Sequence, residues 1–217
     1  MELLHFLFGI FGNAAALFLF LSPVVTFQRI IRSRSTEDFS GVPYNMTLLN
    51  CLLSAWYGLP FVSPDNILVS TINGAGAAIE AVYVVVFLVF ASKPSIRAHT
   101  AALLAAVAVI SLALLDDRPR KLFCGFAAAA FSICMYASPL SIVRLVIETK
   151  SVEYMPFLLS LFVFLCGTSW FIFGLLGHDP FLSVPNGCGS ALGAMQQLLL
   201  YTIYRKSRAS KQGANGT

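Results

Sequence analysis

The amino-acid sequence predicts an all-α membrane protein. We expect seven transmembrane helices, arranged as two parallel three-helix-bundle repeats joined by a linker helix (3+1+3). Of the 217 residues, 58% are hydrophobic and only 11% are charged, whereas a soluble domain carries roughly 25% charged residues. The apolar residues gather in runs whose lengths suit a bilayer crossing. The first three runs and the last three also carry the same features in the same order: a Ser-Pro pair, a second proline and the pattern Asn-Gly-x-Gly.

Seven apolar runs define the expected helices. In chain order they cover about 4–28, 43–61, 66–91, 100–115, 122–146, 156–177 and 181–204. The first run begins without a basic region and is too long for the core of a cleaved signal peptide, so we expect it to be a transmembrane helix. The fourth is the weakest, because it is shorter than the ~20 residues that a spanning helix usually needs.

Basic residues in the loops predict the orientation. Eleven of the 14 Lys and Arg residues fall on one side of the predicted membrane. They are Arg29, Arg32, Arg34, Lys93, Arg97, Arg144, Lys150, Arg205, Lys206, Arg208 and Lys211. The richer side is expected to be cytosolic, so the N-terminus lies outside and the C-terminus inside. The net charge of +4 then reflects membrane orientation rather than a nucleic-acid partner, and a plasma-membrane location is expected by default.

The two halves of the chain resemble each other. The stretch "SPVVTFQRIIRSRSTEDFSGVP" (22–43) is similar to "SPLSIVRLVIETKSVEYMP" (138–156), and the order Asn-Gly-x-Gly occurs at Asn73 and again at Asn186. One helix between two units of three leaves both units in the same orientation, and small transporters place their substrate between such repeats. The expected organisation is a first repeat over 1–91, a linker over 92–120, a second repeat over 121–205 and a cytosolic tail over 206–217.

Polar residues at matching depths predict a binding site between the repeats. Ser54 and Trp170 lie about 16 and 21 Å along their helices at 1.5 Å per residue, near mid-membrane. The expected site residues are Ser54, Asn73, Trp170 and Asn186, with Asn50 and Cys166 one turn below. Amide groups match the vicinal hydroxyls of a neutral sugar, and an indole face packs on the apolar face of a pyranose. For each Asn alone, helix–helix hydrogen bonding with Gly allowing close approach is the alternative.

Four prolines stand toward the cytosolic ends of four helices. They are Pro23, Pro43, Pro139 and Pro156. A proline inside a helix removes one backbone hydrogen bond and clashes with the carbonyl four residues back, so Pro23 and Pro139 are expected to kink their helices. Pro43 and Pro156 also fit first-turn prolines, which cost nothing. We interpret the ring of four as a hinge layer for an inner gate.

The stretches "TEDFSGVPYNMTLLNCLLSAWYGLPF", "STINGAG" and "PNGCG" closely resemble the glucose-preferring clade of the plant SWEET (MtN3/saliva) sugar transporters. The resemblance covers residues 4–205, and SWEET proteins are among the transporters built from parallel repeats. It implies a bidirectional facilitative uniporter that moves a monosaccharide, glucose in the first place, down its gradient by alternating access. It also implies mono- or disaccharide substrates, a lipid bilayer around the chain, a homo-oligomer such as a trimer, and no cofactor.

The same resemblance implies roles for individual residues. The family's substrate pocket maps onto the six site residues above, and its proline tetrad onto the four prolines. Its outer gate pairs Tyr57 with Asp179, and its size-selecting position is Met135. The fourth span and the loop after it are shorter than the family pattern.

Other functional classes fit less well. A seven-helix receptor for a small polar ligand remains the alternative, although the internal repeat has no role in it. A retinal protein needs a lysine within a span, and every Lys lies in a loop or tail. We predict neither a metal site nor an enzyme, because no cluster of His, Asp or Cys falls at mid-membrane. Glu80 is the one carboxylate expected within the spans. It is either a wetted or hydrogen-bonded side chain or a proton site.

Overall fold

The computed structural model describes residues 2–37, 39–91, 119–135, 137–149 and 157–214, together with three isolated positions between 98 and 105. Every element in these ranges is a helix. Apart from two isolated positions, the expected fourth span, 100–115, lies outside the described residues, as does Pro156.

The first repeat begins with a helix that is broken once. Helix α1 (Glu2–Leu21) ends just before Pro23, and α2 (Val24–Ser33) begins just after it. Pro23 has no backbone N–H and its ring crowds the preceding turn, which explains the predicted interruption. Helices α3 (Val42–Tyr57) and α4 (Ile67–Phe90) complete the repeat. Pro43 stands in the first turn of α3, where a proline leaves no hydrogen bond unmade.

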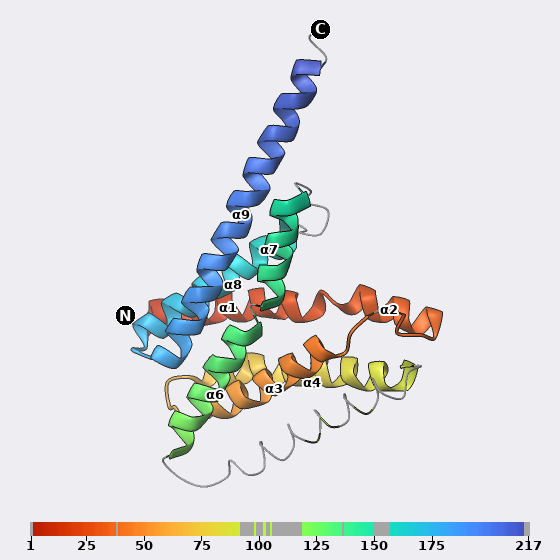
Figure 1. Ribbon diagram of the computed structural model, residues 1–217. Coiled ribbons are helices and arrows are strands. Elements are labelled where there is room, and N and C mark those ends of the chain that lie inside the picture. The colour runs from red at the N-terminus through yellow and green to blue at the C-terminus, as the bar shows by residue number, and fades with distance from the viewer. Residues whose placement is uncertain are drawn as a thin grey trace.

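The second repeat follows the same plan. Helices α6 (Pro119–Met135) and α7 (Ala137–Thr149) lie on either side of position 136, which is outside the described residues, and Pro139 falls within α7. Helices α8 (Phe157–Leu176) and α9 (Pro180–Ala214) complete it. Helix α9 runs well past the expected end of the last span, at 204, and projects from the molecule (Figure 1).

Three described helical stretches are long and apolar enough to cross a membrane on length and composition. They are Glu2–Ser33, Ile67–Phe90 and Phe157–Leu176. The other predicted spans that the structure describes correspond to helices that are shorter or less apolar. Helix α3 has 16 residues, and the fifth span is described as α6 and α7, on either side of position 136.

The repeats meet at one end of the molecule and separate toward the other. Helix α1 packs against α8, and α3 packs against α6, so both interfaces cross between repeats. Beyond the break at Pro23, α2 packs against α4, and in the second repeat α7 packs against α6 and α9. Figure 1 shows α2 and the C-terminal part of α9 pointing in different directions. We call the end that holds the α3–α4 and α8–α9 connections the closed end, and the end that holds α2 and α7 the open end.

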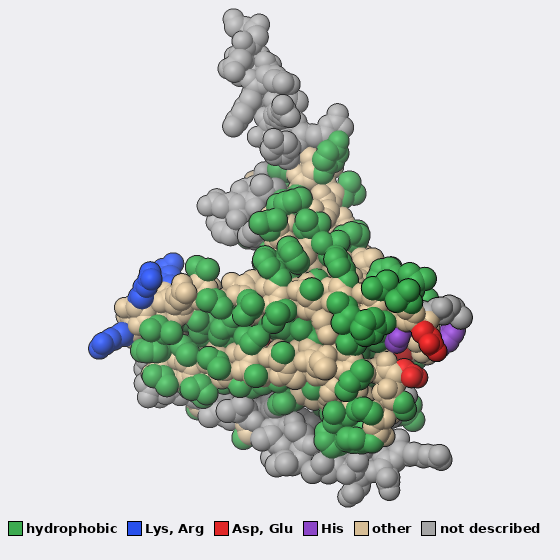
Figure 2. Space-filling model, turned by 180° about the vertical axis from the view of Figure 1, so that it is seen from behind, with side chains coloured by type: hydrophobic (Ala, Val, Ile, Leu, Met, Phe, Trp, Pro, Cys, Tyr) green, Lys and Arg blue, Asp and Glu red, His purple; other side chains and the backbone are tan. Residues whose placement is uncertain are grey.

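The face shown in Figure 2 is apolar over most of the described helices, and basic and acidic side chains gather at opposite ends of that view. Arg29 and Arg32 belong to α2, at the open end, whereas Asp65 and His178 stand in the connections at the closed end. An apolar belt between two charged ends is what a bilayer-embedded protein requires.

Close backbone contact between α8 and α9 gives a first prediction. A Cβ atom on Gly174 would lie 2.6 Å from the Ser183 backbone nitrogen, whereas a Cβ on Gly74 would meet nothing within 4 Å. Gly174→Ala is expected to destabilise the protein by about 1–3 kcal/mol through overpacking. Gly74→Ala, also within a helix, is expected to be neutral or slightly stabilising. Thermal unfolding of the two purified variants checks this, and equal melting temperatures would contradict the packing described.

Candidate functional site

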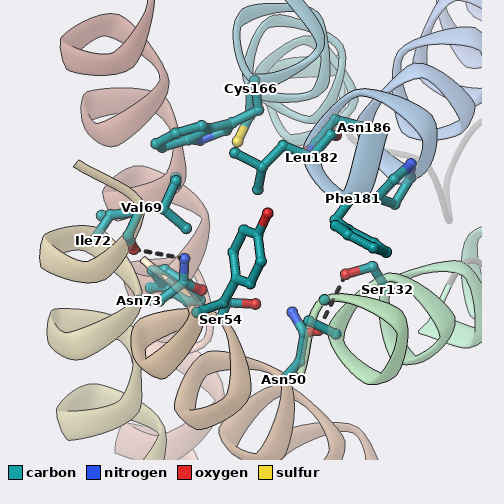
Figure 3. Close-up of a pocket in the computed structure, with 17 residues that line it drawn as sticks. Asn50, Ser54, Val69, Ile72, Asn73, Ser132, Cys166, Phe181, Leu182 and Asn186 are labelled. Atoms are coloured by element: carbon teal, nitrogen blue, oxygen red, sulfur yellow. Dashed lines mark hydrogen bonds between the residues drawn. The ribbon is translucent and has the colours of Figure 1, made fainter. Parts of the chain in front are cut away.

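A cavity of about 160 Å³ lies between the two repeats (Figure 3). Helices α1, α3 and α4 of the first repeat and α6, α8 and α9 of the second contribute to its wall. Its lining residues are Ala16, Phe20, Asn50, Ser54, Tyr57, Val69, Ile72, Asn73, Gly125, Ala128, Ser132, Cys166, Trp170, Phe181, Leu182, Pro185 and Asn186. All six predicted substrate-binding residues are in this set.

The two predicted amides have the same local geometry in the two repeats. Asn73 Nδ2 donates to the carbonyl oxygen of Val69 at 2.9 Å, and Asn186 Nδ2 donates to that of Leu182 at 2.9 Å. Each bond reaches back four residues along its own helix. Among the described residues neither amide oxygen accepts a hydrogen bond, so each amide still offers an acceptor oxygen and a second N–H group to a ligand.

The third amide of the cavity, that of Asn50, is held by its oxygen rather than by its nitrogen. Ser132 Oγ, on α6, donates to Asn50 Oδ1, on α3, at 3.1 Å. Figure 3 shows the Asn50 nitrogen on the cavity side, with the oxygen turned to Ser132. Asn50 therefore has its nitrogen free to donate, whereas Asn73 and Asn186 have their oxygens free to accept. Sequence reasoning missed Ser132, although a single hydroxyl among the alanines of α6, three residues before Met135, was a signal that could have found it.

One wall of the cavity is apolar and rigid. The Trp170 side chain is buried, and its ring contacts Phe173 edge to face at a centroid distance of 5.0 Å. It packs in one cluster with Ala16 on α1 and with Val69 and Ile72 on α4. A Cβ on Gly12 would lie 2.9 Å from Trp170 Nε1, so glycine on α1 permits this close approach between repeats.

Some predicted residues lie away from the cavity. Met135 is the last residue of α6, is half-buried and is absent from the cavity wall. Of the prolines, Pro23 lies at the break between α1 and α2, and Pro43 lies in the first turn of α3. For Pro139 the structure describes only its backbone, within α7.

A buried carboxylate closes one end of the cavity. Tyr57 Oη, on α3, donates to Asp179 Oδ2 at 2.6 Å, so the predicted pair is in contact across the repeats. Asn66 Nδ2 donates to the same oxygen at 2.7 Å. Exposed fractions are 2% for Tyr57, 4% for Asn66 and 8% for Asp179. The network is therefore shielded from water, where hydrogen bonds to a charge are strongest.

The other oxygen of Asp179 caps a helix. Oδ1 accepts from the backbone N–H groups of Phe181 at 3.0 Å and Leu182 at 3.3 Å, in the first turn of α9. A carboxylate at a helix N-terminus also interacts favourably with the helix dipole. Both oxygens thus have two donors each, which offsets the cost of burying the charge.

Sequence reasoning missed Asn66, although its position within the repeat could have revealed it. Asn66 stands seven residues before Asn73, and Asp179 stands seven residues before Asn186. Asn66 and Asp179 therefore occupy corresponding positions in the two repeats, and their side chains meet across the interface.

Glu80 lies outside the cavity. Its side chain is buried at 3% exposure, on the α4 face that packs within the first repeat, and it is not in the cavity wall. Its Oε2 atom has no hydrogen-bond partner among the residues that the structure describes. Across those residues no group of three or more His, Cys, Asp and Glu side chains is placed to hold a metal ion.

The family model described as a sugar efflux transporter for intercellular exchange matches the chain twice, at 6–95 and 122–209. Among curated relatives, the bidirectional sugar transporter SWEET1b of Oryza sativa subsp. indica is 71% identical over 96% of this chain and 82% of its own length. The bidirectional sugar transporter SWEET1 of Arabidopsis thaliana is 63% identical over 97% of this chain and 87% of its own. A solved eukaryotic SWEET transporter is 43% identical with a TM-score of 0.88, over 94% of this chain and 98% of that one.

The Asp179 network gives a second prediction, on access to the cavity. Tyr57→Phe removes a hydrogen bond to a charged group, worth about 1.5–3 kcal/mol, and weakens the closed end. A membrane-impermeant thiol reagent, added on the side that the closed end faces, is expected to label Cys166 in the cavity wall roughly tenfold faster. Cys166→Ser identifies the labelled site, and Tyr44→Phe, outside this network, serves as the matched control. Labelling no faster than in the wild type would show that this bond does not hold the end closed.

Proposed function

The chain belongs to the SWEET family of sugar transporters, and on that premise we propose that it is a bidirectional facilitative uniporter for a monosaccharide. The observation that carries the proposal is the matched pair of amides, one from each repeat, in a cavity between the repeats. A site shared by two similar halves is the arrangement on which alternating access depends.

The polarity of the cavity supports a neutral polyol as substrate, and we propose glucose. Asn73 and Asn186 present acceptor oxygens, Asn50 presents a donor, and Trp170 supplies an apolar wall. Each sugar hydroxyl is both donor and acceptor and can satisfy either kind of group. The 160 Å³ of space is many times the ~10–15 Å³ that one water molecule requires. Met135, at the end of α6, is proposed to limit substrate size from just beyond the cavity wall.

The proposed cycle follows from the two ends of the molecule. In this structure the Asp179 network holds the repeats together at the closed end, while α2 and α7 diverge at the open end. We propose that the closed end faces the outside, so that this arrangement is inward-open. Breaking the network would open the outer side, and bending at the break near Pro23, and at Pro139 within α7, would close the inner one.

The setting of the protein is also a proposal. The excess of Lys and Arg at the open end supports an external N-terminus and a cytosolic C-terminus. A plasma-membrane location and a homo-oligomer, such as a trimer, are proposed with it.

The test of this function is radiolabelled glucose uptake into liposomes that contain only this protein. Asn73→Ala and Asn186→Ala each remove one hydroxyl partner, worth about 0.5–1.5 kcal/mol. The KM is therefore expected to rise about 2- to 10-fold. Asn45→Ala is the matched control. Its amide donates to the Gly41 carbonyl oxygen four residues back, as the two site amides do, but it lies outside the cavity. Wild-type KM values in both site variants would contradict the assignment, and no uptake by the wild type would contradict the function.

Flux is expected to be passive. An ion-coupled carrier needs a group in the substrate path that changes charge or binds an ion. The buried carboxylate of Glu80 lies away from the cavity. Uncouplers and sodium removal should leave uptake unchanged, and Glu80→Gln should transport equally well at pH 5.5 and pH 8. Accumulation of sugar above its outside concentration under an imposed proton gradient, lost in Glu80→Gln, would overturn this.

A further inference from the structure

The break at Pro23 leaves backbone carbonyls without their usual donors. The Leu19 carbonyl would normally accept from residue 23, which as proline has no N–H. It accepts instead from Ser22, whose backbone nitrogen lies at 3.2 Å and whose Oγ lies at 2.8 Å. Inside a membrane such freed groups must be satisfied by neighbouring side chains or helices.

The next freed carbonyl is satisfied from another helix. Phe20 O would accept from Val24 in an unbroken helix, but within the described chain no backbone amide donates to it. Tyr83 Oη, on α4, donates to Phe20 O at 3.0 Å. The Tyr83 hydroxyl thus replaces the amide that the break removes.

The Tyr83 ring also contacts the segment beyond the break. It stacks on Phe27 of α2 at a centroid distance of 4.3 Å and an interplanar angle of 12°, and Tyr44 of α3 meets both rings edge on. Tyr83 is 5% exposed. One rigid side chain therefore holds α1 through its hydroxyl and α2 through its ring, and so fixes the direction in which α2 leaves the break.

We propose that Tyr83 is a positioning residue for transport, which sets the angle of the Pro23 hinge and thereby favours the arrangement with the open end open. The proposal rests on the proposed uniport function and extends it to a residue outside the cavity. Because Tyr83 does not line the cavity, its loss should change how often each side is open and leave sugar contacts unchanged.

The test compares Tyr83→Phe with Tyr44→Phe, which removes a hydroxyl from the same aromatic cluster. Glucose KM values are measured from each side in proteoliposomes of defined orientation. An apparent KM is the intrinsic value divided by the fraction of carrier open to that side. In Tyr83→Phe the ratio of the open-end KM to the closed-end KM is expected to rise roughly 3- to 10-fold. Tyr44→Phe should keep the wild-type ratio. A general loss of folded protein would lower the maximal rate and leave this ratio unchanged.

A double-mutant cycle tests whether the effect passes through the hinge. Pro23→Ala restores the backbone donors, so adding Tyr83→Phe to it should have no further effect on the ratio. If Tyr83→Phe alone fails to fold, the pair with Pro23→Ala should fold. An unchanged ratio in Tyr83→Phe, a full effect in the Pro23→Ala background, or misfolding in both would each overturn the proposal.

A wild-type protein that moves no sugar would contradict the proposed function but would still allow the hinge to be tested. Spin labels on noncanonical side chains at Arg32 of α2 and Glu148 of α7, both exposed, report the opening between these helices. A distance distribution shifted to shorter values in Tyr83→Phe, and not in Tyr44→Phe, supports the proposal, and identical distributions would refute it.

Discussion

The buried carboxylate of Asp179 is the constraint on which the rest of this structure depends. A charge taken out of water is tolerated only where donors surround it, and here they come from both repeats. Tyr57 and Asn66 reach it from the first repeat, and the backbone amides at the start of α9 reach it from the second. Any movement that separates the repeats at this end leaves a buried charge short of partners. The two repeats are therefore held together at the closed end, and they remain free to move apart at the open end.

The cavity combines residues that are the same in the two repeats with residues that differ between them. Asn73 and Asn186 keep the same hydrogen bond to the residue four positions back, so the two repeats present equal acceptors to one ligand. Around them the repeats differ. One supplies Asn50, held by a serine from the other repeat, and the other supplies the indole wall of Trp170. Seven residues before each amide, one repeat has Asn66 and the other Asp179. This asymmetry provides a neutral donor and a charged acceptor, where two carboxylates would repel each other.

Much of this could be predicted from the sequence, because length, hydrophobicity and repeat order act locally. The helices of the two repeats, the break at Pro23, the six cavity residues and the Tyr57–Asp179 pair followed from spacing or from family resemblance. The residues that escaped prediction, Asn66, Ser132 and Tyr83, act through partners distant in the chain. Ser132 binds a side chain 82 positions away, and Tyr83 binds a carbonyl 63 positions away. A single sequence does not reveal such pairings, although the repeat register did contain the signal for Asn66. For Pro43 the sequence left two interpretations open, a hinge proline or a first-turn proline, and the structure places it in the first turn of α3.

On this mechanism the repeats must part at the Asp179 end for sugar to cross. Cross-linking the repeats at that end tests this requirement. With Asn66 and Asp179 both replaced by cysteine, a short, reversible bifunctional thiol reagent can join the two repeats where their side chains now meet. The linked protein is expected to move no sugar yet still to bind it from the open end. Flux should return when reductant cleaves the link, and neither single-cysteine variant should respond to the reagent in this way. Undiminished sugar flux through the linked protein would show that the repeats do not need to part there.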